Sequence, residues 1–306
     1  MAEQQAQAGA TRCGFAALIG APNVGKSTLV NALVGSKITI VSSKVQTTRA
    51  LMRGIAMEGD AQIILVDTPG IFTPKRRLDR AMVSAAWSGA HDADIVCIML
   101  DAKRGLDDEA LAIMKQVGAS RRPMFLVINK VDLVAREKLL GLAQAANEQL
   151  KFAHTFMIAA VSGDGVADLR TAMAAAMPTG PFLYPPDQIS DAPERFLAAE
   201  VTREKIYHKL HQELPYQSTV ETTSWTERKD GSVRIEQTIF VERESQRKIV
   251  LGKGGATIKA IGADARKELG EALERPVHLF LFVKVREDWG DDPERYREMG
   301  LEFPKR

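Results

Sequence analysis

Short apolar stretches alternate with helical patterns over the first half of the chain. The stretches cover residues 15–19, 62–66, 94–100, 124–128 and 155–158, and a helical pattern at residues 26–34 follows the first of them. Such alternation is typical of stacked βαβ units, in which a helix connects each pair of parallel strands. We therefore expect an α/β domain with a mostly parallel sheet and helices on both of its faces.

A cluster of prolines ends this pattern. The cluster consists of Pro178, Pro181, Pro185, Pro186 and Pro193. Because proline lacks a backbone N–H, it interrupts helices and central strands. We place a linker at residues 181–193, between a first domain at 12–180 and a second at 194–290. We expect residues 1–11 to be disordered and residues 291–306 to form a C-terminal tail.

The second domain has a different pattern of expected helices and strands. Its expected elements are a helix at 194–214, strands at 218–227 and 232–242, helices at 245–251 and 256–273, and a strand at 277–285. Asp230-Gly231 lies between the first two strands and indicates a hairpin turn. In the strand at 232–242 the apolar residues share one face, which only Gln237 interrupts. The order αββααβ predicts a small α+β domain.

Composition limits the function less than these patterns do. A chain of 306 residues with 45% hydrophobic and 26% charged residues is ordinary globular protein, and its apolar runs are too short to cross a bilayer. The first residues lack the features of a signal peptide, so we expect a cytoplasmic location. Cys13 and Cys97 lie beside apolar residues and are expected to be buried, reduced thiols. A net charge of +2 does not by itself indicate a polyanion partner.

A glycine-containing loop lies between the first apolar stretch and the first helix. Its residues, Gly20, Ala21, Pro22, Asn23, Val24, Gly25, Lys26 and Ser27, match the pattern GxxxxGK[ST]. In such a loop successive N–H groups and the helix N-terminus face phosphates. We expect Lys26 to reach the β- and γ-phosphates and Ser27 to bind Mg²⁺. An ordinary strand-to-helix turn is the alternative, and the flanking strand and helix argue against it.

A second motif selects the base. Asn129, Lys130, Val131 and Asp132 follow the buried stretch at 124–128 and match NKxD. A carboxylate such as Asp132 can accept hydrogen bonds from N1–H and the 2-amino group of guanine, whereas adenine offers neither donor there. An unpaired buried partner costs about 1–3 kcal/mol, so the motif predicts GTP rather than ATP.

A third motif would complete the site. Asp67, Thr68, Pro69, Gly70 and Ile71 follow the stretch at 62–66, and the end of a strand is where ligands bind in open α/β sheets. We expect Asp67 to hold Mg²⁺ and the Gly70 amide to approach the γ-phosphate. A threonine of the segment Gln46-Thr47-Thr48-Arg49 would complete the metal shell, and we favour Thr48 over Thr47. A solvated threonine-rich loop remains the alternative for that segment.

The second domain carries an RNA signature. Gly252, Lys253, Gly254 and Gly255 lie between two helices and resemble the GxxG loop of a type II KH domain. Around this loop basic residues outnumber acidic ones: Arg243, Arg247, Lys248 and Lys259 join Lys253, against Glu244 alone. The loop and its neighbours Arg247, Lys248 and Lys259 are the RNA-binding residues that we expect. A solvated basic face is the alternative.

These motifs together are similar to those of the Era family of ribosome-assembly GTPases, over residues 12–289. The resemblance implies a GTPase that uses GTP/GDP and Mg²⁺ and acts on the γ-phosphate through Lys26, Thr48 and Gly70. It also implies a monomer that binds the 3′ end of 16S ribosomal RNA, takes part in maturation of the 30S particle and associates loosely with the cytoplasmic membrane. Two rivals are an RNA-binding module with a structural nucleotide pocket, and a membrane-surface GTPase without RNA.

The chain departs from related patterns at two points. Ala159-Ala160 stands where the family has Ser-Ala, so the guanine contact is expected from the Ala160 amide or from Ser162. Ile71 stands where Ras-like enzymes carry the glutamine that orients water, so intrinsic hydrolysis should be slow. Asn23 stands where some relatives recruit K⁺, which makes a potassium requirement a hypothesis.

Four further residues are assigned no ligand. His208 and His211 lack partners for a metal site and are expected at the surface. Trp289 is expected to pack rather than to stack on a base. Arg203 and Lys205 are expected to be ordinary solvated charges.

Overall fold

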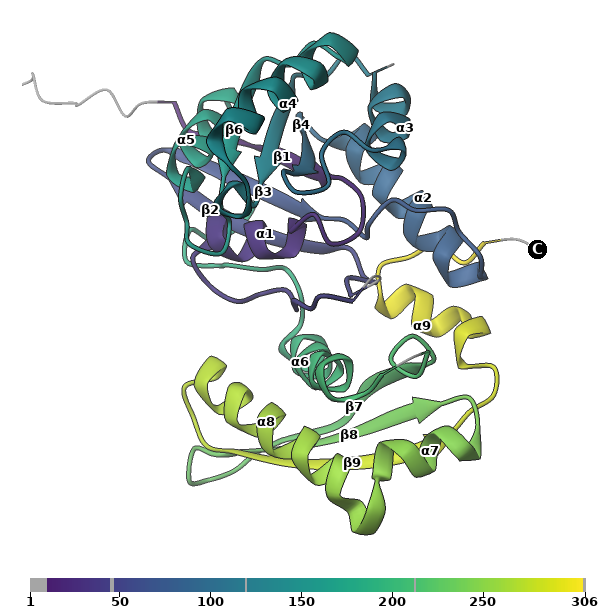
Figure 1. Cartoon of the computed structure of the whole chain (residues 1–306). Coiled ribbons are helices and arrows are strands. Elements are labelled where there is room, and N and C mark those ends of the chain that lie inside the picture. Colours follow the sequence, from purple (N-terminus) through teal and green to yellow (C-terminus); the bar gives the residue numbers. More distant parts are fainter. Residues whose placement is uncertain (1–9, 45–46, 119, 212, 305–306) are drawn as a thin grey trace, which may run out of the picture. The chain divides into compact units, whose positions relative to one another are not determined.

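The computed structural model describes residues 10–44, 47–118, 120–211 and 213–304, and the chain forms two compact units (Figure 1). The first unit runs to Ile38 and adds Ala50–Pro74 and Met82–Asp191. The second contains Thr39–Arg49, Lys75–Ala81 and the chain from Ala192 onward. The boundary between Asp191 and Ala192 therefore falls inside the predicted linker. We did not foresee that the two short segments Thr39–Arg49 and Lys75–Ala81 belong to the second unit, because their contacts are remote in sequence.

The first unit is a six-stranded sheet in the order β2-β3-β1-β4-β5-β6. The strands are β1 (Arg12–Ile19), β2 (Met52–Glu58), β3 (Ala61–Asp67), β4 (Ile95–Asp101), β5 (Met124–Asn129) and β6 (His154–Ile158). Neighbours pair in parallel except β2, which runs antiparallel to β3. The mostly parallel α/β fold is thus confirmed. We missed β2, whose mixed sequence lacks a continuous apolar run.

The helices α1 (Lys26–Val34), α2 (Arg77–Asp92), α3 (Asp108–Val117) and α4 (Arg136–Gln149) connect these strands, and α5 (Val166–Ala176) follows β6. Every residue of β3 and β4 is buried, and both strands are apolar except for Gln62 and the terminal aspartates Asp67 and Asp101. Strands buried on both faces read as continuous apolar runs. Because the parallel strands end at one edge, the polar residues that follow β1, β3 and β5 share that edge.

The second unit has the predicted order αββααβ. Its main elements are α6 (Glu194–Lys209), β7 (Ser218–Glu227), β8 (Val233–Val241), α7 (Glu244–Leu251), α8 (Ala256–Ala272) and β9 (Val277–Val285). Strand β8 is central, antiparallel to β7 and parallel to β9. Helix α6 ends five residues before the predicted end, at Lys209, because Leu210 adopts an extended backbone. Leu210 and Leu214 still pack in the core.

One polar side chain interrupts the buried face of β8. Gln237 is fully buried, accepts a hydrogen bond of 2.5 Å from the Thr202 hydroxyl on α6, and donates to Thr222 on β7. Buried amides are tolerated when they are paired in this way. The hairpin turn forms where predicted, because Gly231 has φ +80° and the Asp230 carboxylate accepts from the Ser232 amide.

The end of the chain is more ordered than we predicted. Residues 293–298 form helix α9 (Pro293–Glu298), and Tyr296 is fully buried with its hydroxyl donating to the Gly290 carbonyl at 2.7 Å. The predicted tail at 291–306 is therefore wrong for its described part, since Tyr296 supplies apolar area that holds it. The predicted disorder of residues 1–11 falls largely outside the described residues. No helix of the described chain is long and apolar enough to cross a bilayer.

Candidate functional site

The loop between β1 and α1 depends on two glycines. Gly25 has φ +100°, a conformation that glycine adopts without strain, and it precedes the first turn of α1. A Cβ at Gly20 would lie 2.8 Å from the Met99 carbonyl. The loop therefore adopts a backbone that most other residues would not permit, as expected for a loop whose amides face phosphates.

Lys26 is held inside this loop. Its side chain is buried, and Nζ donates to the carbonyls of Gly20 and Ala21, each at 3.0 Å. Burial lowers the pKa of Lys26 to about 8, while the nearby Asp67 carboxylate acts in the opposite direction. A buried ammonium without an anion against it is costly. A bound phosphate would supply the missing negative charge, so the site suits an anionic ligand.

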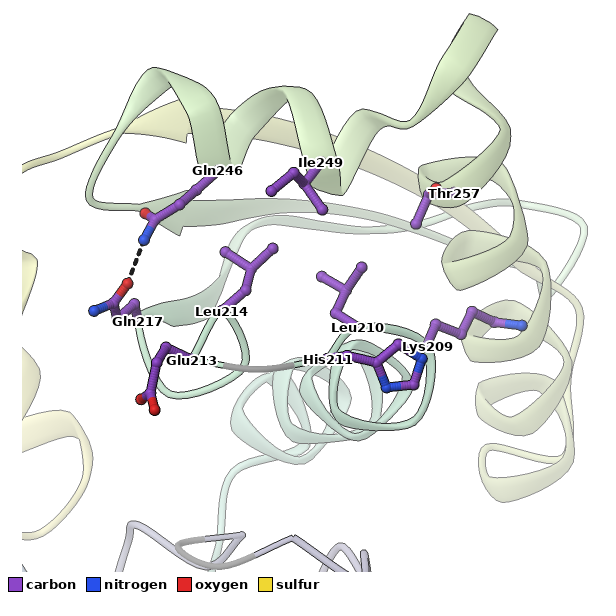
Figure 2. A pocket seen from close by; sticks show the side chains of 9 residues that line it. All are labelled: Lys209, Leu210, His211, Glu213, Leu214, Gln217, Gln246, Ile249 and Thr257. Carbon is purple, nitrogen blue, oxygen red and sulfur yellow. Dashed lines mark hydrogen bonds between the residues drawn. The ribbon is translucent and has the colours of Figure 1, made fainter.

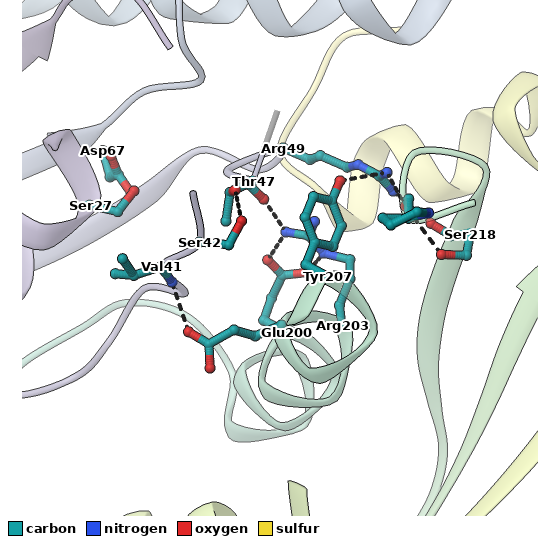
Figure 3. Close-up of polar contacts among 12 residues, drawn as sticks. Ser27, Val41, Ser42, Thr47, Arg49, Asp67, Glu200, Arg203, Tyr207 and Ser218 are labelled. Carbon is teal, nitrogen blue, oxygen red and sulfur yellow. Dashed lines mark hydrogen bonds and ion pairs between the residues drawn. The ribbon is translucent and has the colours of Figure 1, made fainter. Parts of the chain in front are cut away.

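The two predicted metal ligands of the first unit meet. The Ser27 hydroxyl donates to Asp67 Oδ2 at 2.9 Å (Figure 3). Asp67 is fully buried at the end of β3, and Ser27 lies in the first turn of α1. A hydroxyl and a carboxylate are oxygen donors of the kind that Mg²⁺ prefers, so the pair fits that ion. Both residues would hold it beside the phosphate loop.

The segment after Asp67 packs against the same loop. The Thr68 hydroxyl donates to the Leu18 carbonyl at 2.7 Å, and the Ile71 amide donates to the Gly20 carbonyl at 3.2 Å. A Cβ at Gly70 would lie 2.9 Å from Pro22 Cα. Gly70 is thus required for the close approach of the segment Thr68-Pro69-Gly70 to the phosphate loop.

The NKxD segment is bonded to the phosphate loop. Asn129 is buried, and its Nδ2 donates to the Val24 carbonyl at 2.8 Å. Lys130, in the left-handed conformation at φ +64°, donates to the Asn23 carbonyl at 2.6 Å. These two bonds link the segment expected to read the base to the segment expected to hold the phosphates. They make one continuous site from motifs a hundred residues apart.

The remaining base-site candidates lie nearby. A short 3₁₀ turn (Val131–Leu133) carries Asp132, whose exposed carboxylate is accessible to a ligand. The Ala160 amide donates to Asn129 Oδ1 at 3.0 Å. The Ser162 hydroxyl and amide both donate to the Ala159 carbonyl. In this structure the Ala160 amide therefore orients Asn129, a role that the sequence did not suggest.

Asp101 is a member of this site that we missed. It ends β4, is buried, and accepts from Lys130 Nζ at 2.6 Å and from the Lys103 amide at 2.9 Å. Asp101 therefore positions the lysine of NKxD. The available signal was its place at the carboxyl end of a buried strand, the same rule that identified Asp67.

The threonine segment belongs to the second unit, whereas Ser27 and Asp67 belong to the first. Gln46 lies outside the described residues. The Thr47 hydroxyl contacts that of Ser42 at 2.7 Å and donates to the Lys44 carbonyl. Thr48 is half-buried. The proposed metal role of Thr48 thus remains a prediction.

Arg49 is the strongest anchor of this segment. Its buried guanidinium donates to the carbonyls of Ser218, Pro215 and Tyr216 and to the Tyr207 hydroxyl, at 2.8–3.1 Å (Figure 3). It also lies over the Trp289 ring, 5.6 Å from the centroid. Burial lowers the pKa of Arg49. The guanidinium fork matches this ring of acceptors as a lysine could not.

Two cations of α6 correct our expectation of solvated charges. Arg203 is 2% exposed and donates to the Thr47 carbonyl and to Glu200, both at 2.5 Å. Lys205 is also buried and pairs with Glu204 and Glu268. Glu200 and Glu204 are local partners on α6, but the Thr47 carbonyl and Glu268 are brought close only by the tertiary fold, so the local pattern did not reveal the burial.

The GxxG loop has an unusual backbone. Gly252, Gly254 and Gly255 all have positive φ, at +72°, +59° and +78°. A Cβ at Gly252 would lie 2.2 Å from the Thr257 hydroxyl, whereas one at Gly254 would meet open space. Lys253 is exposed. A bare, exposed backbone with a lysine at its tip can approach sugar-phosphates closely.

The neighbouring basic residues are also accessible. Lys248 and Lys259 are exposed, and Arg247 is half-exposed with a salt bridge to Glu244 at 2.9 Å. The loop adjoins a cleft of about 460 Å³ between the segment after α6 and the helices α7 and α8 (Figure 2). Its lining includes Lys209, Ile249 and Thr257. Ile249 is exposed in this cleft, which offers an apolar surface to a base beside the loop.

The residues that we set aside behave largely as expected. His208 and His211 are exposed, as expected. Trp289 is buried and its indole N–H donates to the Gln217 carbonyl at 3.1 Å, so it packs rather than stacks on a base. Cys13 and Cys97 are buried free thiols.

Comparisons with known proteins agree with this geometry. A family model described as a 50S ribosome-binding GTPase matches residues 15–130, and a KH domain model matches residues 213–290. The GTPase Era of Afipia carboxidovorans is 78% identical over 305 residues, covering 100% of this chain and 98% of the relative. That of Rhizobium meliloti is 64% identical over 295 residues, covering 96% and 94%.

Solved structures give the same result. The Era of Aquifex aeolicus bound to GDP and AlF4⁻ has a TM-score of 0.90 at 36% identity, covering 95% of this chain and 99% of that one. An Era in complex with MgGDPNP and nucleotides 1506–1542 of 16S ribosomal RNA has a TM-score of 0.89 at 36% identity, with the same coverage. Fold, motif geometry and full-length similarity thus converge, and the chain belongs to the Era family of GTPases.

Proposed function

We propose that this GTPase is a GTP-dependent switch that binds the 3′ end of 16S ribosomal RNA through the loop at Gly252–Gly255 and assists maturation of the 30S subunit. The solved Era in complex with nucleotides 1506–1542 of 16S ribosomal RNA supports the RNA partner. A cytoplasmic location, expected from the polar first residues, and loose membrane association and a monomeric state, which the family resemblance implies, also belong to the proposal.

One observation carries the nucleotide half of the proposal. The bonds from Asn129 to the Val24 carbonyl and from Lys130 to the Asn23 carbonyl join the base-reading and phosphate-binding segments. A ligand that is contacted by both segments must carry a guanine and a phosphate chain at a fixed separation. Pre-organised sites of this kind lose little conformational entropy on binding.

The chemistry of the first unit is positioning and charge stabilisation. The amides of residues 20–27 and the Lys26 ammonium would hold the phosphates and stabilise the charge that develops on the γ-phosphoryl oxygens. Gly70 would bring its amide to the γ-phosphate, and Ser27, Asp67 and Thr48 would hold Mg²⁺. When bound, Mg²⁺ neutralises charge on the β- and γ-phosphates.

The identity of residue 71 limits the intrinsic rate. Ile71 follows Gly70 and carries no group that could orient a water molecule, the role of glutamine in Ras-like enzymes. Hydrolysis by the isolated protein is therefore slow. Bound RNA or another component of the ribosomal particle would accelerate it by ordering the segments that carry Thr48 and Gly70.

The RNA half rests on the exposed loop of the second unit. Lys253 lies at the tip of a backbone with three glycines at positive φ, and Lys248 and Lys259 flank it. KH loops clamp about four nucleotides of a single strand through such a backbone. The adjoining cleft with the exposed Ile249 would accept the bases.

Two variants test the halves separately. Lys26→Ala should abolish GTP turnover, because it removes the buried cation that faces the phosphates. Lys253→Asp with Gly254→Asp should abolish crosslinking to the 3′ end of 16S ribosomal RNA while leaving turnover intact, since two carboxylates repel phosphate. Aspartate tolerates the positive φ of position 254 better than most residues do. Turnover that survives the first change, or crosslinking that survives the second, would reject the corresponding half.

A further inference from the structure

The three-stranded sheet of the second unit has a face opposite α6, α7 and α8, which α9 contacts at Phe240, where the Arg295 guanidinium lies 4.4 Å from the ring centroid. Along β9, residues 277, 279, 281 and 283 pack into the apolar clusters shared with the helices. The alternate residues His278, Phe280, Phe282 and Lys284 are all exposed. Because side chains alternate along a strand, these four lie together on the opposite face.

Phe280 and Phe282 are 43% and 48% exposed. Scattered apolar residues are common on surfaces, but two large rings side by side on one strand expose an aromatic surface that folding alone does not require. Residues two apart on a strand project in the same direction about 7 Å apart. The rings are thus spaced to receive two bases of one extended strand.

Strand β8 places cations beside these rings. Arg234 pairs in register with His278, and its guanidinium lies 4.9 Å from the centroid of the Phe280 ring. Glu236 pairs with Phe280 and contacts Arg234 at 2.6 Å. Glu236 is half-buried and offsets part of the Arg234 charge, while Lys284 at the other end of the row adds an exposed cation.

We propose that this face, formed by Arg234, His278, Phe280, Phe282 and Lys284, binds a segment of single-stranded RNA. Two bases stack on Phe280 and Phe282, and Arg234 and Lys284 contact phosphates. Stacking on aromatic side chains is a general mode of recognition for unpaired bases, and guanidinium planes contribute to it. The proposal rests on the proposed function for the class of its ligand but uses a different surface from the loop at Gly252–Gly255.

The charge pattern favours RNA over a protein or a lipid surface. The two rings stand in a row of charged and polar groups and not in a broad apolar patch of the kind that buries against another protein. Stacking also uses ring planes, which leucine cannot supply although it is similarly apolar. This difference gives a direct test.

The test compares Phe280→Leu/Phe282→Leu with Phe280→Tyr/Phe282→Tyr in the full-length protein. The ligand is a fluorescent single-stranded RNA of about 20 nucleotides, several times longer than the four that a KH loop clamps. Its affinity is measured by anisotropy at fixed salt. The leucine variant should bind at least about 10-fold more weakly, since one stacked base typically contributes about 5- to 150-fold. The tyrosine variant should bind as the unmodified protein does.

Phe303→Leu is a matched control, because Phe303 is 37% exposed but lies outside the sheet. It should leave RNA affinity unchanged, and GTP turnover should be equal in all variants. Ultraviolet crosslinking should recover RNA on the peptide that contains residues 277–285. Equal RNA affinity of the leucine variant and the unmodified protein would overturn the proposal.

Two outcomes separate the possible failures. If Lys253→Asp/Gly254→Asp abolishes binding and the leucine variant does not, the proposed function stands and the second surface is rejected. If the leucine variant keeps its RNA affinity but loses sedimentation with phosphatidylglycerol vesicles, the face binds membrane, which also rejects the proposal. Loss of RNA affinity in the leucine variant with retention in the tyrosine variant supports it.

Discussion

Substitution of Gly25 tests whether the NKxD segment, expected to read the base, and the loop at residues 20–27, expected to hold the phosphates, act as one site. A Cβ at this position would lie 2.2 Å from Asn129 Nδ2, and the backbone there has φ +100°. Gly25→Ala therefore imposes two penalties: backbone strain, and displacement of the Asn129 amide from the Val24 carbonyl. Gly35, which follows the other end of α1, has φ +78° and no atom within 4 Å of its would-be Cβ.

The difference between the two glycines isolates the Asn129 contact. Both alanine variants carry a strain of about 1–2 kcal/mol from positive φ. Only Gly25→Ala also loses a buried hydrogen bond, which costs about 1–3 kcal/mol more. The free energy of unfolding should thus fall by about 1–2 kcal/mol in Gly35→Ala and about 2–5 kcal/mol in Gly25→Ala.

Guanine nucleotide affinity should separate the variants further. Gly25→Ala moves the segment that we predict to contact the base, so the affinity for GDP should fall by about 5- to 150-fold, the equivalent of the lost bond. Gly35→Ala should leave affinity within about 2-fold, because that strain is the same in free and bound protein. Titration with a fluorescent GDP analogue measures the affinity, and urea denaturation measures the free energy of unfolding. Equal affinities of the two variants would refute the coupling of the segments.

Three further predictions follow from single contacts. In a magnesium-free buffer at pH 8, GDP binding should take up about half a proton, because Lys26 has a pKa of about 8 in the free protein and an adjacent phosphate raises that pKa. The affinity for GDP should then fall as the pH rises above 8. Calorimetry in buffers of different ionisation enthalpy measures the proton uptake, and an uptake of zero would contradict the prediction. Arg49→Lys should lower the free energy of unfolding of the second unit by about 2–4 kcal/mol, since several carbonyls lose a charged donor; hydrogen exchange of β7 amides checks this, and unchanged exchange would contradict it. GTP turnover should be faster in K⁺ than in Na⁺ if Asn23 helps to hold the ion, and equal rates would remove that role.

The nucleotide site was predictable from sequence because its residues follow a simple topological rule. The loop after β1, Asp67 after β3 and Asn129 at the end of β5 lie where parallel strands end, and short motifs fix their spacing to those ends. Each prediction needed only a local pattern and the strand before it. Asp101 obeys the same rule, but it lacks a motif and was therefore missed.

The parts that escaped prediction depend on partners that are distant in sequence. Arg203 and Lys205 look solvated because a helical segment with alternating charges usually is. Their burial depends on the Thr47 carbonyl and on Glu268, each more than sixty residues from its partner. Residues 291–304 look like a polar tail for the same reason, since the burial of Tyr296 requires the surfaces of the folded unit.

The segment Thr39–Arg49 belongs to the second unit and carries the threonine that we predict as a metal ligand. Thr48, the predicted metal ligand, stands between Thr47, whose carbonyl accepts from Arg203, and Arg49, whose guanidinium has four acceptors among residues 207–218. Hydrogen bonds to charged groups contribute about 1.5–3 kcal/mol each. A nucleotide that draws Thr48 toward Ser27 and Asp67 must either preserve these bonds or break them at that cost. If Thr48 binds the metal as predicted, the state of the γ-phosphate bears on the contacts that Thr47 and Arg49 make with α6 and β7, and GTP binding is then coupled to the conformation of the second unit.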